Sequence, residues 1–86
     1  MTRKSIRLSE HAKEQLFYRG ATEEEVLAAI RTCPWFEAER GKLECRKDFS
    51  YLKEWNGKKY ATKQVRPIFV EEADEIVVIT IYTYYF

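Results

Sequence analysis

The single histidine, His11, is the residue of this sequence best suited to proton transfer near neutral pH. If residues 10–19 form a helix, Gln15 lies about 40° and Arg19 about 80° from His11 around the helix axis. All three then share one flank of the apolar stripe. This placement predicts either a general acid or base with Arg19 nearby, or a partly buried histidine bonded to a backbone carbonyl.

A basic segment lies in the middle of the chain. Residues 40–66 carry nine Lys and Arg against three acidic residues, whereas the whole chain has a net charge of only +1 and both ends are acidic. Aromatic residues are interleaved with these bases, which is typical of surfaces that contact phosphate and stack bases. The same pattern also fits a solvated hairpin whose lysines protect a sheet edge from aggregation.

Four residues are candidates for catalysis, and four for RNA binding. Arginine presents a planar fork that suits phosphate, and tyrosine can stack on a base or transfer a proton. The catalytic candidates are His11, Arg66, Lys63 and Tyr82, and the RNA-binding candidates are Arg19, Arg46, Lys58 and Tyr84. Lys63 shares the parity of Ala61 and Val65, so it lies at the rim of the core face unless the strand register slips by one residue.

No metal or cofactor is expected. The two cysteines, Cys33 and Cys45, belong to no CxxC or Cys/His cluster, and we expect both to be free thiols. The sequence contains no Walker loop, GxGxxG or HExxH, so it lacks the local motifs of nucleotide hydrolases, dinucleotide oxidoreductases and zinc proteases.

Two N-terminal helices are predicted from their end signals. Ser9 can cap a helix over residues 10–19, and Gly20 is placed to end it. Thr22 and Glu25 have the spacing of a capping box, which predicts a second helix over residues 23–32, before Pro34. The short joint between them makes a helical hairpin or an angled pair within residues 9–33.

The rest of the chain has strand periodicity. Alternation over residues 42–49 predicts a half-buried strand, and Asn56-Gly57 predicts a hairpin turn between flanks that pair antiparallel. The sheet continues through Ile68–Val70, and residues 71–75 form a polar turn. The last strand starts at Ile76, is apolar on both sides at first, and later exposes one face.

These elements predict one α+β domain over residues 1–86. Two N-terminal helices pack on one face of a three- to four-stranded, mainly antiparallel sheet over residues 42–86. The longest uncharged run, at residues 76–86, is far shorter than the ~20 apolar residues of a membrane helix. The N-terminus has no apolar stretch of a secretory signal, so we expect a cytoplasmic location and no membrane partner.

The helical part and the last strand resemble a bacterial family of small domains, the domain-of-unknown-function family 4258. The resemblance rests on a His-Ala pair at residues 11–12, an Arg-Gly joint at residues 19–20, a second helix ending before Pro34, and the strand at residues 76–82. It implies a fold like that of RelE- and ParE-type toxins, a metal-independent ribonuclease activity, and functional roles for His11, Arg19 and Tyr82.

Two hypotheses of function follow. In the first, the protein is an endoribonuclease of a toxin–antitoxin system, which cuts RNA by attack of the 2′-hydroxyl and has an antitoxin protein as partner. In the second, it is a non-catalytic module that binds nucleic acid or protein through its tyrosine-rich face, or through strand addition at a sheet edge. Substituting His11 abolishes cleavage under the first and leaves binding nearly intact under the second.

Overall fold

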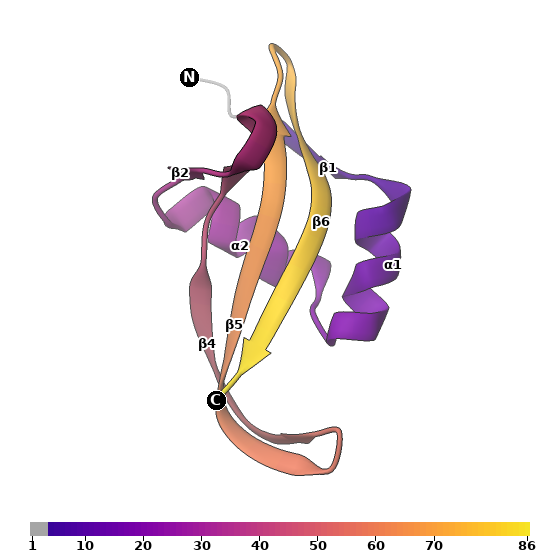
Figure 1. Cartoon of the computed structure of the whole chain (residues 1–86), viewed down its shortest axis with the longest axis vertical. Coiled ribbons are helices and arrows are strands. Elements are labelled where there is room, and N and C mark those ends of the chain that lie inside the picture. Colours follow the sequence, from indigo (N-terminus) through magenta and orange to yellow (C-terminus); the bar gives the residue numbers. More distant parts are fainter. Residues whose placement is uncertain (1–3) are drawn as a thin grey trace.

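The computed structural model describes residues 4–86 and has an α+β fold with two helices and a mixed six-stranded sheet. Figure 1 shows the sheet running the length of the molecule, with the two helices beside and behind it. The elements in chain order are β1 (Ser5–Leu8), α1 (Glu10–Arg19), α2 (Glu23–Thr32), β2 (Phe36–Glu37), the 3₁₀ turn η1 (Glu39–Gly41), β3 (Leu43–Glu44), β4 (Lys47–Trp55), β5 (Lys58–Glu71) and β6 (Glu75–Tyr85).

Both helices begin and end where their signals predict. The Ser9 side chain accepts a hydrogen bond from the backbone N–H of Ala12, and Gly20 ends α1 in the left-handed conformation with φ 72°. Thr22 and Glu25 form the complete capping box at the start of α2. These end contacts explain why the sequence confines each helix to ten residues.

The central hairpin is also confirmed. Asn56 and Gly57 join β4 to β5 with φ of 52° and 82°, which is the two-residue turn that their residue types favour. β5 then continues through Pro67, where it passes the break between β3 and β4. A proline is tolerated there because no strand on that side needs its missing N–H.

The sheet is larger than predicted, and it is not purely antiparallel. Its strand order is β1-β6-β5-β3-β2, with β4 also paired to β5, and β1 runs parallel to β6. The predicted count of three to four strands is therefore too low. β1 and β2 lie outside residues 42–86 and are four and two residues long, too short to show strand periodicity.

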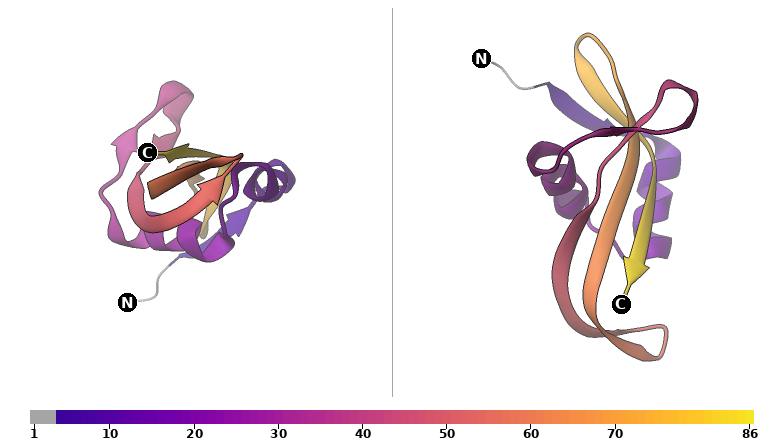
Figure 2. Two further views of the ribbon diagram at one scale, coloured as in Figure 1. Left: turned by 90° about the horizontal axis from the view of Figure 1, so that it is seen from below. Right: turned by 60° about the vertical axis from the view of Figure 1, so that its left-hand side comes forward.

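One face of the sheet is covered and carries the core. α2 lies across this face, and α1 lies along the side of β6 (Figures 1 and 2). Phe69, Val78 and Ile81 of the sheet pack with Val26 and other residues of the helices in one buried cluster. The β4–β5 hairpin extends beyond the helices and curls at its tip, so the molecule is 42 Å long but only 24 Å wide.

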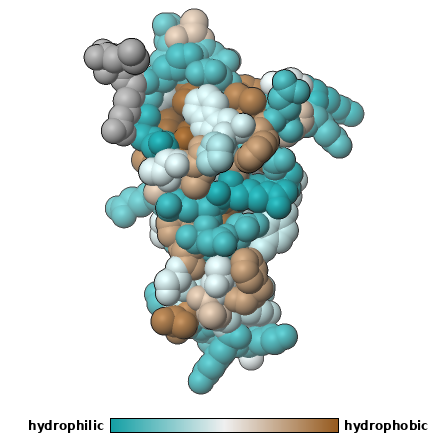
Figure 3. Space-filling model, turned by 90° about the vertical axis from the view of Figure 1, so that its left-hand side faces the viewer, coloured by the Kyte–Doolittle hydropathy of each residue, from teal (hydrophilic) through white to brown (hydrophobic). Residues whose placement is uncertain are grey.

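The other surfaces are mixed in character. On the side where β4 lies, hydrophobic side chains form small groups among hydrophilic ones (Figure 3). No helix in residues 4–86 is long and apolar enough to cross a membrane.

Candidate functional site

The uncovered face of β5 and β6 gathers three of the candidate residues. In the strand register Arg66 lies opposite Tyr82, and Gln64 lies opposite Tyr84. Directly opposed residues of antiparallel strands point to the same side of the sheet. Arg66, Tyr82 and Tyr84 therefore share the face that α2 does not cover.

Tyr82 is the centre of this group. The guanidinium carbons of Arg19 and Arg66 each lie 5.5 Å from the centroid of its ring. Arg66 comes from the neighbouring strand, whereas Arg19 reaches the ring from the last turn of α1. Guanidinium groups grouped around one ring can bind phosphate, and an exposed aromatic ring beside them, such as that of Tyr84, can stack on a base. We call Arg19, Arg66, Tyr82 and Tyr84 the open-face cluster.

Arg66 is held in place by two partners. Its Nε donates to the carboxylate of Glu44, and its Nη1 donates to the Tyr84 hydroxyl at 3.2 Å. The hydrogen bond that Arg66 donates to Glu44 raises the pKa of Arg66 above its ordinary value. The guanidinium is thus fixed in direction, and part of its charge is balanced.

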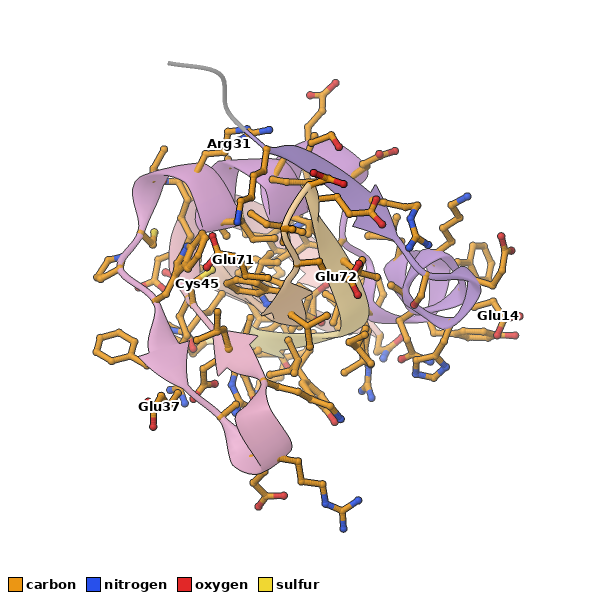
Figure 4. All side chains as sticks on the ribbon, turned by 90° about the horizontal axis from the view of Figure 1, so that it is seen from above. Glu14, Arg31, Glu37, Cys45, Glu71 and Glu72 are labelled. Carbon is orange, nitrogen blue, oxygen red and sulfur yellow. The ribbon has the colours of Figure 1, made fainter. Side chains whose placement is uncertain are left out.

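A cavity of about 720 Å³ opens beside Arg66 and Tyr82. One wall is formed by η1 and the residues on either side of it, 37–42. This segment lies on the side of the sheet opposite α2, and Figure 4 shows Glu37 on it, away from the body of the molecule. The lining combines acidic, basic and apolar groups: Glu37, Ala38, Glu39, Arg40, Lys42, Glu44, Arg66, Ile68, Thr80 and Tyr82. The cavity is therefore wide and polar enough for part of a nucleotide chain.

His11 lies on α1 and does not join the cluster. It is exposed on the first turn of α1, eight residues before Arg19, which corresponds to about 12 Å along the helix axis. Arg19 Nε donates to Gln15 Oε1 at 3.1 Å, and helical spacing puts His11 on the same flank of α1 as these two residues.

Lys63 lies on the covered face of the sheet, opposite the face of the open-face cluster. The strand register therefore does not slip, and Lys63 keeps the parity of Val65. Its Nζ is 2.8 Å from a carboxylate oxygen of Glu25 and donates to the carbonyl of Gly20 at 2.9 Å, and the residue is buried. It also lies 5.3 Å from the ring centroid of Tyr51. The structure therefore does not bring Lys63 together with Arg66 and Tyr82.

The two remaining RNA-binding candidates lie elsewhere. Arg46 is exposed between β3 and β4 and lines a smaller cavity with Pro34 and Phe36. Lys58 begins β5 at the tip of the hairpin, 5.7 Å from the ring centroid of Tyr60. The basic segment of the sequence is thus spread over both faces of the sheet and the hairpin tip.

Sequence reasoning missed Glu44 as a member of the site. The signal was present, because Glu44 has the same parity as Arg46 on the polar side of the predicted strand. What alternation could not show is the pairing of β3 with β5, which brings Glu44 opposite Ile68 and next to Arg66.

The cysteines and acidic residues add no second centre. Both cysteines are free, and burial raises the pKa of Cys45 to about 12, so its thiol stays protonated between α2 and the sheet (Figure 4). Within residues 4–86 no group of three or more His, Cys, Asp and Glu side chains is close enough to hold a metal ion.

Comparison of the chain with family models, with curated proteins and with solved structures found no match.

Proposed function

We propose that this protein is a metal-independent endoribonuclease of the toxin–antitoxin type, a member of the domain-of-unknown-function family 4258 with a RelE- or ParE-like fold. The observation that carries the proposal is the open-face cluster, in which Tyr82 has the guanidinium groups of Arg19 and Arg66 over its ring. The family, its toxin role and an antitoxin partner are supported by the sequence resemblance.

The proposed reaction needs three functions. A base removes the proton of the 2′-hydroxyl, and the 2′-oxygen attacks phosphorus to form a pentacoordinate phosphorane. Cations stabilise the negative charge of that species, and an acid donates a proton to the 5′-oxygen as its bond to phosphorus breaks. The products are a 2′,3′-cyclic phosphate and a 5′-hydroxyl.

The cluster supplies the cations and one proton-transfer group, and we assign the other proton transfer to His11, which lies outside the cluster. Arg66, held by Glu44 and Tyr84, and Arg19 at the end of α1 are the cations. Tyr82, at the centre of the cluster, is one proton-transfer group, and His11, exposed on the first turn of α1, is the other. Lys63 has no part in this chemistry because it is buried on the other face.

Single-stranded RNA is the substrate that fits this surface best. A base can stack on the exposed ring of Tyr84 while the phosphates of the RNA backbone meet the arginines around Tyr82. The adjoining cavity then receives the neighbouring nucleotide.

Incubation with end-labelled single-stranded RNA in EDTA tests the proposal. We expect fragments ending in a 2′,3′-cyclic phosphate, and a rate lowered about hundredfold or more in Tyr82→Phe and in His11→Gln. Tyr18→Phe is the matched control, since Tyr18 is 69% exposed on α1 and outside the cluster. Intact RNA at high concentrations of the wild-type protein rejects the proposal for free RNA.

The second function, a non-catalytic module that binds nucleic acid or protein, is favoured by one observation. Glu44 neutralises part of the charge of Arg66, and Glu37 and Glu39 also line the cavity. Such a surface retains stacking groups but has less charge to stabilise a phosphorane. RNA that binds wild-type protein and His11→Gln equally well, and is never cut, identifies this second function.

A further inference from the structure

Three side chains of the sheet bind the joint between the helices. Thr83 Oγ1 and the Tyr85 hydroxyl donate to the carbonyl of Arg19 at 2.8 and 2.6 Å, and Lys63 Nζ donates to the carbonyl of Gly20 at 2.9 Å. Carbonyls at the end of a helix have no partner within it and carry its negative pole. Two hydroxyls and one ammonium therefore complete the C-terminal end of α1. We call this set the joint clamp.

The residues of the joint clamp are themselves held by further partners. Glu25, which pairs with Lys63, also accepts from the backbone N–H of Thr22 at the start of α2. The indole of Trp55 stacks on the Tyr85 ring with centroids 4.9 Å apart and an angle of 18° between the planes. Lys63 thus links both helices to β5, and the hairpin tip braces Tyr85.

No space remains at the joint for movement toward the sheet. A Cβ atom placed on Gly20 would lie 2.5 Å from Trp55 and 2.6 Å from the Tyr85 hydroxyl oxygen. Burial raises the pKa of Tyr85, so its hydroxyl keeps the proton that it donates to the joint.

The clamp and the open-face cluster meet in one residue. Arg19 is held through its carbonyl by Thr83 and Tyr85 on the covered face, while its side chain lies over Tyr82 on the other. Adjacent residues of a strand point to opposite faces. We propose that Tyr85 and Lys63 are positioning residues that set the Arg19 guanidinium over Tyr82 from the opposite side of β6, and the effect on cleavage rests on the proposed function.

A purely structural role makes a different prediction. If the clamp only docks α1, loss of one hydrogen bond lowers stability and leaves the Arg19 side chain over Tyr82. If it positions Arg19, the same loss moves the guanidinium while the fold persists. Tyr85→Phe separates the two, because it removes the hydroxyl and keeps the ring that stacks on Trp55.

The first measurement follows Arg19 itself. The Nε–Hε resonance of Arg19 in NMR spectra feels the ring current of Tyr82, and Tyr82→Leu gives its value without the ring. We expect Tyr85→Phe to move this resonance at least halfway toward the Tyr82→Leu value. Tyr60→Phe is the matched control, as Tyr60 lies 5.7 Å from the Tyr85 ring and should leave the resonance unchanged. An unmoved Arg19 resonance in folded Tyr85→Phe overturns the proposal.

The second measurement uses cleavage. We expect Tyr85→Phe to lower kcat about tenfold with little change in KM, because misplacement of a charge-stabilising group acts on the transition state. In an Arg19→Gln background the same substitution should have no further effect on kcat. An undiminished tenfold loss in that background shows that Tyr85 acts through something other than Arg19 and overturns the proposal.

Lys63 is tested in a double variant in which its partner Glu25 is also replaced. Lys63→Met leaves the Glu25 carboxylate unpaired and can prevent folding, so Lys63→Met/Glu25→Gln is used, in which both charges are removed. We expect the Arg19 resonance of the double variant to shift as in Tyr85→Phe, and an unshifted resonance excludes Lys63 from the positioning role. If wild-type protein cuts no RNA, the proposed function fails while the resonance measurements still decide the positioning of Arg19.

Discussion

Lys63 and Arg66 lie close together on β5, on opposite faces of the sheet, and each is paired with a carboxylate. The Lys63 side chain is 7% exposed and directs its ammonium to Glu25 and to a backbone carbonyl. The Arg66 side chain is 23% exposed, next to an open tyrosine ring and a cavity. A single strand thus uses one cation to hold the helices together and places the other at an open surface beside a cavity.

This difference shows why charge in a sequence is a poor guide to a binding surface. Both residues belong to the same basic segment, and only the face that each occupies distinguishes them. A buried cation must have all its partners within the protein, because an unpaired charge there is strongly destabilising. A partly exposed cation can exchange its partner for a phosphate.

Removing the buried cation should have the largest effect. Lys63→Met leaves Glu25 unpaired, and we expect the free energy of unfolding to fall by about 3 to 5 kcal/mol in urea denaturation. Lys63→Met/Glu25→Gln should recover most of this loss, since no buried charge is left alone. Equal losses in the single and double variants would contradict the assignment of the pair.

Adding one methyl group at the joint should have the next largest effect. Gly20→Ala places a Cβ against Trp55 and Tyr85 at a φ of 72°, and we expect a loss of about 2 to 3 kcal/mol by thermal or urea unfolding. Gly41→Ala is the control, because Gly41 has a φ of 75° and nothing within 4 Å of the added atom. It should show only the backbone cost, about 1 kcal/mol. Similar losses at both sites would show that the contacts at Gly20 are unimportant.

A smaller effect on stability is expected on the open face. Glu44→Gln removes the charged partner of Arg66, whose guanidinium is within reach of water, so the loss should be about 1 kcal/mol or less. Binding of single-stranded RNA in low salt should instead become severalfold tighter, as the freed positive charge is available to phosphate. Weaker RNA binding in a folded Glu44→Gln variant would show that Arg66 needs Glu44 for its position rather than being masked by it.

The exposed pair of Arg7 and Glu75 should have the smallest effect. Its hydrogen bond lowers the pKa of Glu75 below the ordinary value of 4.5, so the pair stabilises the fold above that pH and its contribution is lost as pH falls through the lowered pKa. Glu75→Gln should therefore cost less stability at pH 7 than Glu44→Gln. Wild type and Glu75→Gln should converge in acid unfolding measurements, and a difference that grows in acid would contradict this sign.

Much of the fold could be predicted because its signals are local. Ser9, Gly20 and the capping box of α2 determine the helix ends through contacts within a few residues, and Asn56-Gly57 does the same for the hairpin. The short strands have no such signal. β1 and β2 are four and two residues long and form only because longer elements bring their segments into the sheet. The strand predicted over residues 42–49 is present but divided into β3 and the start of β4.

The site was predictable in its residue types and not in its arrangement. Arg19, Arg66 and Tyr82 were candidates by chemistry, and the structure brings them together. Lys63 could not be separated from them, since its face depends on a strand register and on Glu25 in a distant helix. Strand pairing, which is a long-range property, decides which basic residues share a surface.

The parallel pairing of β1 with β6 has a consequence for synthesis. Residues 5–8 hydrogen bond beside residues 75–78, so the first strand has no partner until nearly the whole described chain has been translated. Contacts so distant in sequence form late and slowly. While the ribosome makes the intervening segment, the apolar side chains of Ile6 and Leu8 stay open to chaperones, and the completed sheet becomes available only after β6 has left the exit tunnel.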